Sequence, residues 1–112
     1  CGFDVMLEDV TVGLDAAHIM WHQAGGPADV RNGLCLCVLH HKLFDRGVFT
    51  LDEAERVVVS ERSRGRDGFR EWLMAFHGRG IRRPVRDEYR AAGEFLGWHR
   101  REVFRGPGRD VA

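Results

Sequence analysis

Polar and hydrophobic residues alternate in one early stretch of the chain, and this pattern predicts a β-strand over residues 14–20. In a strand, successive side chains point to opposite faces, so His18 and Asp15 should lie on opposite faces of it. A Gly- and Pro-containing loop follows, and the short apolar run 32–37 predicts a second strand. Residues 39–46 are typical of a helix that Gly47 ends. The expected order is a β-hairpin followed by a helix.

The remaining pattern predicts further short strands and helices. Apolar runs at 48–51 and 56–60 indicate two strands, and residues 69–77 indicate a helix. A long final helix is expected over 87–104. Its apolar stripe recurs at spacings of three and four residues and consists of Tyr89, Ala92, Leu96, His99 and Val103. Residues 1–13 read as a turn-rich segment, and the Gly/Pro-rich tail 105–112 as a frayed end. The fold class predicted is α+β.

The length and composition predict one domain over residues 1–112. Hydrophobic residues make up 44% of the 112 residues, which is enough for one modest core. The sequence contains neither a run of about 20 apolar residues nor a basic leader, so we expect no membrane association and a cytoplasmic location. It does not begin with Met, which we interpret as a fragment of a longer protein.

Charge is distributed unevenly, although the formal net charge is zero. Residues 1–30 contain five acidic and no basic side chains, whereas the remainder holds all 17 basic residues against 12 acidic ones. Every basic residue except Lys42 is arginine, whose guanidinium suits forked contacts with phosphate. The pattern favours a phosphate-bearing partner without identifying it. Candidates for the phosphate contacts are Arg82, Arg83, Arg100 and Arg101.

The cysteines indicate metal binding rather than a disulfide framework, because three is an odd number. Cys37 and His40 have the Cys-x2-His spacing of a zinc half-site, and Cys1 is the obvious third ligand. A fourth would come from outside the chain or from Cys35, although Cys35 is expected in the core. The alternative is that Cys37 is a small buried hydrophobe and His40 a core or capping histidine.

Three further side chains could form a catalytic site. His41 lies beside His40 and could hold a second cation against the strand that bears His18. A neutral imidazole at His18 can accept a proton from water. Asn32 precedes Gly33, which is a turn signal. Its amide could instead hydrogen-bond the loop that carries His18 and orient that imidazole.

The segment 15–46, DAAHIMWHQAGGPADVRNGLCLCVLHHKLFDR, resembles an HNH endonuclease motif on a ββα-metal finger. His18 in AAHI matches the first His, Asn32 in NGLCLC the Asn, and His41 in CVLHH the last His. With the later segments FREWLMAFHG and EFLGWHRREVFRGP, the chain is similar to the C-terminal HNH domain of McrA-like, modification-dependent (type IV) restriction endonucleases.

The resemblance implies a metal-dependent DNA endonuclease domain with a core over 14–46 and a C-terminal extension over 47–112. His18 would be the general base, His41 would ligate a catalytic Mg²⁺ or Mn²⁺, and Asn32 would orient the loop of the base. Cys1, Cys37 and His40 would hold a structural Zn²⁺. The implied partners are double-stranded DNA and an upstream domain that reads modified DNA in the parent chain. Members often act in pairs on duplex DNA, so a homodimer is also allowed.

One departure from the motif leaves a metal ligand open. Many HNH motifs carry an acidic residue or His directly before the general base, where this chain has Ala17. Asp15 is the first substitute, followed by Asp45 and His22.

Two other functions fit the pattern. A zinc-stapled DNA-binding module without catalytic activity would need Cys37 and His40 but not His18. An oligomerisation domain would use the final amphipathic helix. Outside the motif, His99 is expected to be a packed core histidine, and His77 to cap a helix end.

Overall fold

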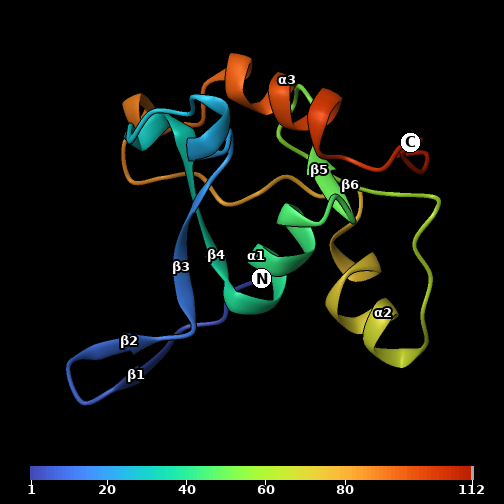
Figure 1. Ribbon diagram of the computed structural model, residues 1–112. Coiled ribbons are helices and arrows are strands. Elements are labelled where there is room, and N and C mark those ends of the chain that lie inside the picture. The colour runs from blue at the N-terminus through green and yellow to red at the C-terminus, as the bar shows by residue number, and fades with distance from the viewer. Residues whose placement is uncertain (112) are drawn as a thin grey trace.

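The hairpin and the helix that follows it form the centre of the molecule, as the hydrophobic pattern predicts. In a computed structural model that describes residues 1–111, strand β3 (Leu14–His18) pairs antiparallel with β4 (Gly33–Cys37), and helix α1 (Val38–Asp45) follows directly. The register pairs Leu14 with Cys37 and His18 with Gly33. Both strands run side by side next to α1 (Figure 1).

Burial explains why these residues form these elements. Ala17 and Ile19 are buried on the face of β3 that packs toward the core, whereas the neighbouring Ala16 and His18 are exposed. Helix α1 buries His40 and Phe44. Its last turn ends at Gly47, whose φ of 75° is a left-handed conformation that glycine adopts without a steric penalty.

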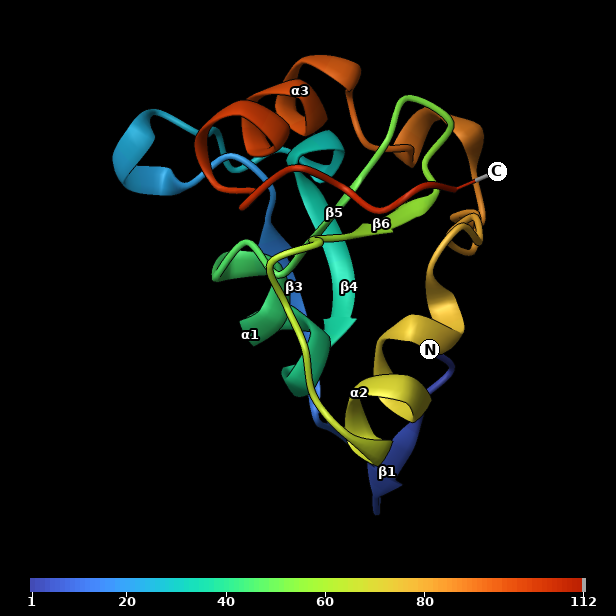
Figure 2. The same cartoon turned by 90° about the vertical axis from the view of Figure 1, so that its right-hand side faces the viewer.

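A second layer completes the core. Strands β5 (Phe49–Leu51) and β6 (Val57–Val59) pair antiparallel, which confirms the two predicted strands. Helix α2 (Asp67–Trp72) and the 3-10 turn η3 (Met74–Phe76) follow, and α3 (Gly93–Glu102) packs against β5. Figure 2 shows α3 lying across the end of this layer. The buried cluster consists of Ile19, Phe44, Phe49, Leu51, Val57, Val59, Leu73 and Leu96.

The prediction of one long helix over 87–104 is wrong at its N-terminal end. A 3-10 turn, η4 (Asp87–Tyr89), is followed by extended backbone at Arg90, and α3 begins only at Gly93. Tertiary contacts hold the extended stretch, because the Arg90 guanidinium pairs with Glu55 and the Ala92 N–H donates to the Arg31 carbonyl at 2.9 Å. The C-terminal part of the predicted stripe is buried, namely Ala92, Leu96, His99 and Val103.

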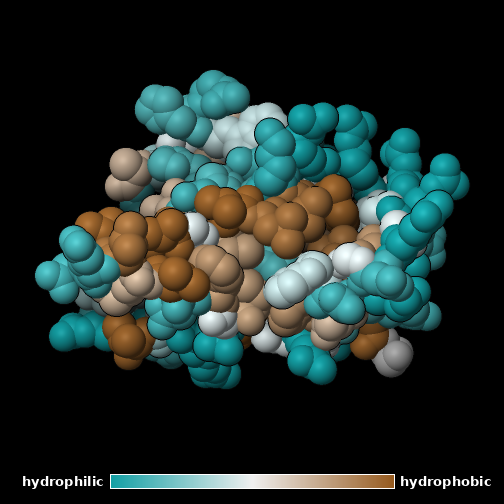
Figure 3. Space-filling model, turned by 90° about the horizontal axis from the view of Figure 1, so that it is seen from below, coloured by the Kyte–Doolittle hydropathy of each residue, from teal (hydrophilic) through white to brown (hydrophobic). Residues whose placement is uncertain are grey.

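The prediction that residues 1–13 lack regular structure is also wrong. Strands β1 (Val5–Leu7) and β2 (Val10–Val12) form a hairpin whose turn places Glu8 at a φ of 54°. All six strand residues are exposed, including the apolar ones. The hairpin projects from the body of the molecule (Figure 1), and the view from below shows apolar side chains gathered at that side and in a band across the middle (Figure 3).

The remaining histidines and the tail show how the second layer is held. His99 is fully buried, as predicted, with its ring stacked on Phe44 at 3.7 Å between centroids. His77 lies at the C-terminal end of η3, as predicted, where its backbone N–H donates to the Met74 carbonyl at 3.1 Å. Its ring makes contacts outside that turn: Nδ1 accepts from the Val59 N–H, and Nε2 faces the Asp110 carbonyl. The tail is not frayed over residues 105–111, because Arg109 N–H donates to the Val59 carbonyl at 2.9 Å. Ala112 lies outside the described residues.

Two 3-10 turns, η1 (His22–Ala24) and η2 (Val30–Asn32), shape the loop between β3 and β4. Across residues 1–111, every helix is too short or too polar to span a bilayer.

Candidate active site and metal centre

Asn32 fastens the loop that leaves the end of β3. Its side chain is 2% exposed, and Oδ1 accepts from the Met20 N–H at 2.8 Å. Its Nδ2 donates to the carbonyls of Met20 and Pro27, both at 3.0 Å. The Asn32 backbone carbonyl also accepts from the Ile19 N–H at 3.0 Å. The predicted hydrogen bonds to the loop after His18 are therefore present, and the asparagine is not merely a turn residue.

His18 is the last residue of β3 and is exposed. Its side chain makes no hydrogen bond to another residue within residues 1–111. Strand alternation turns it to the face opposite Asp15 and the buried Ala17. Ala17 carries no donor atom, so the position before His18 supplies no ligand. The imidazole of His18 is thus available to solvent at the end of a strand whose outer edge is unpaired.

His41 of α1 contacts two carboxylates, and the one on β3, Asp15, links the helix to the hairpin. Its Nδ1 lies 2.7 Å from Oδ2 of Asp15, and its Nε2 lies 3.1 Å from Oδ2 of Asp45. Asp45 is one helical turn further along α1, where i,i+4 side chains meet. All three side chains are partly exposed, at 29% for His41 and just under 40% for the two carboxylates. The structure therefore brings together three of the candidate residues, and His22 is not among the contacts of this group.

The chemistry of this contact suits a cation. A neutral imidazole carries hydrogen on one nitrogen only, so the other presents a lone pair to a carboxylate oxygen. The ring nitrogen and the carboxylate oxygen are then both lone-pair donors, and either a shared proton or a metal ion bound to both can hold them together. Two ligands about 2.1 Å from an octahedral ion at right angles are about 3 Å apart, close to the spacing of Asp15 and His41. Asp45, on the far nitrogen, is placed to accept from the ring N–H and fix its orientation.

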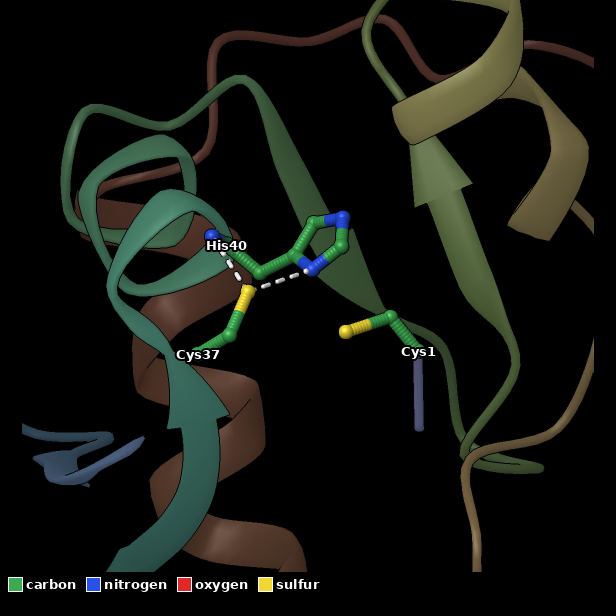
Figure 4. A group of neighbouring side chains, drawn as sticks. All are labelled: Cys1, Cys37 and His40. Atoms are coloured by element: carbon green, nitrogen blue, oxygen red, sulfur yellow. Dashed lines mark hydrogen bonds between the residues drawn. The ribbon is translucent and has the colours of Figure 1, made fainter. Parts of the chain in front are cut away.

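A second cluster lies at the end of the hairpin where Leu14 pairs with Cys37, away from the end that bears His18. Cys1, Cys37 and His40 each place a ligand atom within 4.8 Å of the others, and Figure 4 shows the two sulfurs and the ring converging. Within residues 1–111 this is the one group of three His, Cys, Asp or Glu side chains that meets this criterion. Cys37 ends β4 and His40 lies in the first turn of α1, so the two residues of the Cys-x2-His spacing meet as predicted.

The hydrogen bonds of His40 favour metal ligation. Its Nε2 faces the carbonyl of Trp72, which can only accept, so Nε2 carries the proton. Nδ1 is then a lone-pair donor and lies 3.1 Å from the Cys37 sulfur. A ligating histidine that donates its other N–H to a backbone carbonyl is the usual arrangement around zinc. Both Cys37 and His40 are buried, so the donor set fits a structural Zn²⁺ with one ligand still to be supplied.

The expectation that Cys35 lies in the core is wrong. Its side chain is exposed, and it does not belong to the three-ligand cluster. The position lies two residues before the end of β4, where the hairpin is only two strands wide and nothing covers that part of its surface.

The sequence indicated Asp45 only as a substitute metal ligand. Its i,i+4 spacing from His41 was the signal that could have identified it as a partner of the imidazole ring.

Comparisons with known proteins bear on the family and the fold of this chain. Residues 1–52 match a family model described as HNH endonuclease. The first 52 residues are therefore similar to HNH endonucleases in sequence, and the fold of the chain resembles that of a restriction enzyme. Among solved structures, one described as "Modification dependent TagI restriction endonuclease" is similar, with a TM-score of 0.63 at 24% sequence identity.

The similarity covers 92% of this chain and 32% of that protein, so the chain spans about a third of its structural relative. No curated protein matches the chain.

Proposed function

We propose that this chain is a metal-dependent DNA endonuclease domain that hydrolyses phosphodiester bonds. The observation that carries the proposal is the Asp15–His41 contact, a carboxylate and an imidazole held at ligand spacing beside the strand that ends in His18. Asp15 and His41 would hold a divalent ion, Mg²⁺ or Mn²⁺. When bound, such an ion polarises the phosphate and stabilises charge on the leaving oxygen.

His18 would act as the general base. Its imidazole takes a proton from water, the water oxygen forms a bond to phosphorus, and the bond from phosphorus to the 3′ oxygen breaks. The leaving oxygen takes up a proton from solvent, which gives a 5′-phosphate and a 3′-hydroxyl. Asn32 positions this base, because its three side-chain hydrogen bonds fix the backbone immediately after His18.

The unpaired edge of β3 reconciles the positions of the base and the ligand pair. His18 and Asp15 point to opposite faces, but the sheet is only two strands wide, so one edge of β3 has no neighbouring strand. A phosphate lying along that edge is accessible to side chains from both faces. This placement of the substrate supports a shared site for His18 and His41.

The wider role we propose is the cleavage module of a modification-dependent restriction enzyme. The fold similarity to a protein of that description, and the fact that this chain spans only a third of it, support a parent with a separate domain that reads modified DNA. Cys1, Cys37 and His40 would hold a structural Zn²⁺ that anchors the start of the chain to α1.

Nicking of supercoiled plasmid tests the proposal. The wild-type domain should convert it to open-circle and linear forms only with added Mg²⁺ or Mn²⁺. His18→Ala should slow the reaction by roughly 10²–10⁴-fold, the usual contribution of a general base. His22→Ala is the matched control, since this exposed histidine lies four residues away, and it should keep activity near wild type. Full activity in folded His18→Ala would refute the assignment.

The zinc cluster favours a second candidate function, a zinc-stapled DNA-binding module without chemistry. It requires Cys1, Cys37 and His40 but gives no reason for the Asp15–His41 pair. This alternative predicts DNA binding and no product in the nicking assay with either divalent ion.

A further inference from the structure

We propose that Lys42, Arg46, Arg62 and Arg64 form a phosphate-binding track that carries one backbone of duplex DNA away from the active site. We refer to these four residues as the cationic track. The proposal rests on the proposed function, because it takes duplex DNA as the partner, and it assigns substrate binding to residues that the sequence did not single out.

The first argument is the absence of partners. Many arginines of this chain are engaged within the fold, including Arg56 with Asp52, Arg90 with Glu55, and Arg100 with the Leu51 carbonyl. The four residues of the cationic track are exposed and have no ion pair or side-chain hydrogen bond within residues 1–111. Among the acids near these residues in sequence, Asp45 contacts His41 and Asp67 contacts Arg70, whereas Glu61 is exposed and forms no ion pair within residues 1–111. These cations are therefore left to meet an external anion.

The second argument is their position on α1. Successive helical residues are turned by about 100°, so Lys42 and Arg46 lie one above the other on the solvent side of the helix, opposite the buried Phe44. Lys42 directly follows His41 in sequence. Its side chain is turned by about 100° from the His41 ring, toward the solvent side of the helix.

The third argument joins the helix to the loop between β6 and α2. Arg62 and Arg64 line a shallow groove together with Leu39 and Leu43 of α1. On the helix, Arg46 is turned only about 20° from Leu39 and lies about 10 Å further along the axis. Two of the four cations are thus on the exposed side of α1, and the other two line a groove that this helix borders.

Cations near a helix C-terminus also stabilise its dipole, and this would account for Lys42 and Arg46 without DNA. It does not account for Arg62 and Arg64, which lie in a loop. A measurement of binding, and not of stability alone, therefore separates the two explanations.

The test is the salt dependence of affinity for a short fluorescein-labelled duplex, measured by anisotropy without added divalent ion in the His18→Ala background. Each neutralised phosphate contributes about 0.9 to the slope of log K against log salt. Arg46→Gln, Arg62→Gln and Arg64→Gln combined should lower that slope by about 2.7. Between 50 and 200 mM salt, the parent should then lose roughly 40-fold more affinity than this variant.

The matched control combines Arg79→Gln, Arg82→Gln and Arg83→Gln. These three arginines also lack a side-chain ion pair in the described chain, but they line the groove next to the Cys1 cluster, so the proposal transfers to the track the phosphate contacts that the sequence suggested for Arg82 and Arg83. The control should keep the parental slope, and thermal melting should show that both variants remain folded. An unchanged slope in the track variant, an equal loss in the control, or no binding by the parent would overturn the proposal.

The same proteins with His18 restored separate this proposal from the proposed function. Track-dependent binding without any nicking would remove the nuclease assignment and leave the cationic track intact. If the protein nicks plasmid but the track variant does not change the slope of log K against log salt, the nuclease assignment stands and the cationic track is removed.

Discussion

Replacing Asn32 tests how the fold positions the proposed base. Asn32→Ala removes three side-chain hydrogen bonds, one to the Met20 N–H and two to the carbonyls of Met20 and Pro27. Each such bond contributes about 1 kcal/mol net, and a partner left buried without a hydrogen bond costs about 1–3 kcal/mol. Because Asn32 is 2% exposed, water does not readily replace the amide. We expect a loss of about 3–4 kcal/mol in the free energy of unfolding.

Urea denaturation followed by tryptophan fluorescence measures this loss. With a slope of about 1.5 kcal/mol per molar urea, the midpoint should fall by about 2 M. Asp29→Ala is the matched control in the same loop, since its carboxylate accepts one exposed hydrogen bond from the Arg31 N–H. Removing this cap should cost about 1 kcal/mol or less.

Cleavage by folded Asn32→Ala, measured well below its melting temperature, should fall by about 10–100-fold, as is usual when a positioning partner is lost. A loss of stability below 1 kcal/mol, equal to that of the control, would refute the reasoning that these bonds fix the loop.

Three further predictions concern the other polar groups. Burial lowers the pKa of His99 to about 4, from 6.5 in the unfolded chain, so its contribution to stability is complete above about pH 6.5 and is lost as pH falls toward 4. Between about pH 7.5 and pH 5, the urea midpoint should therefore drop by an amount equivalent to about 2 kcal/mol. A drop just as large in His99→Gln would contradict this prediction. Metal analysis of purified protein should find zinc in the wild type and in Cys35→Ser but not in Cys37→Ser; zinc retained by Cys37→Ser would rule out the cluster. Asp15→Asn should abolish saturation of cleavage by Mg²⁺, whereas Asp45→Asn should weaken the apparent Mg²⁺ affinity by about 10–100-fold; the opposite ranking would exchange their roles.

The hairpin, α1 and the hydrogen bonds of Asn32 could be predicted from sequence because their signals are local. Alternation over 14–18, the glycine after α1 and the Cys-x2-His spacing each act within a few residues. The observed ends of β3, β4 and α1 differ from the predicted ones by at most two residues. The three zinc candidates meet in space because Cys37 and His40 flank one strand-to-helix junction.

The failures arose where distant parts of the chain override a local pattern. The apolar spacing over 87–104 is helical, but pairing of Arg90 with Glu55 keeps the backbone extended before Gly93. The His77 ring contacts β6 and the tail, and no residue near it in sequence predicts these contacts. Cys35 lies on a strand whose surface is uncovered, and the sequence does not reveal how wide the sheet will be.

The proposed catalytic arrangement also depends on a contact across the fold. Asp15 and His41 are 26 positions apart, and the sequence could rank Asp15 as a substitute ligand but could not show that it touches His41. The register of β3 against β4, together with the packing of α1, decides that contact. The second carboxylate on the ring, Asp45, follows from helical spacing alone.

Chemical rescue of a cavity at residue 18 is the most direct test of the central claim that this imidazole removes the proton from water. Plasmid nicking with Mg²⁺ would be measured for wild type and for His18→Gly, each with and without free imidazole. We predict that His18→Gly loses roughly 10²–10⁴-fold in rate, that added imidazole restores part of it, and that imidazole does not accelerate the wild type. Nicking by folded His18→Gly at the wild-type rate in the absence of imidazole would contradict the account.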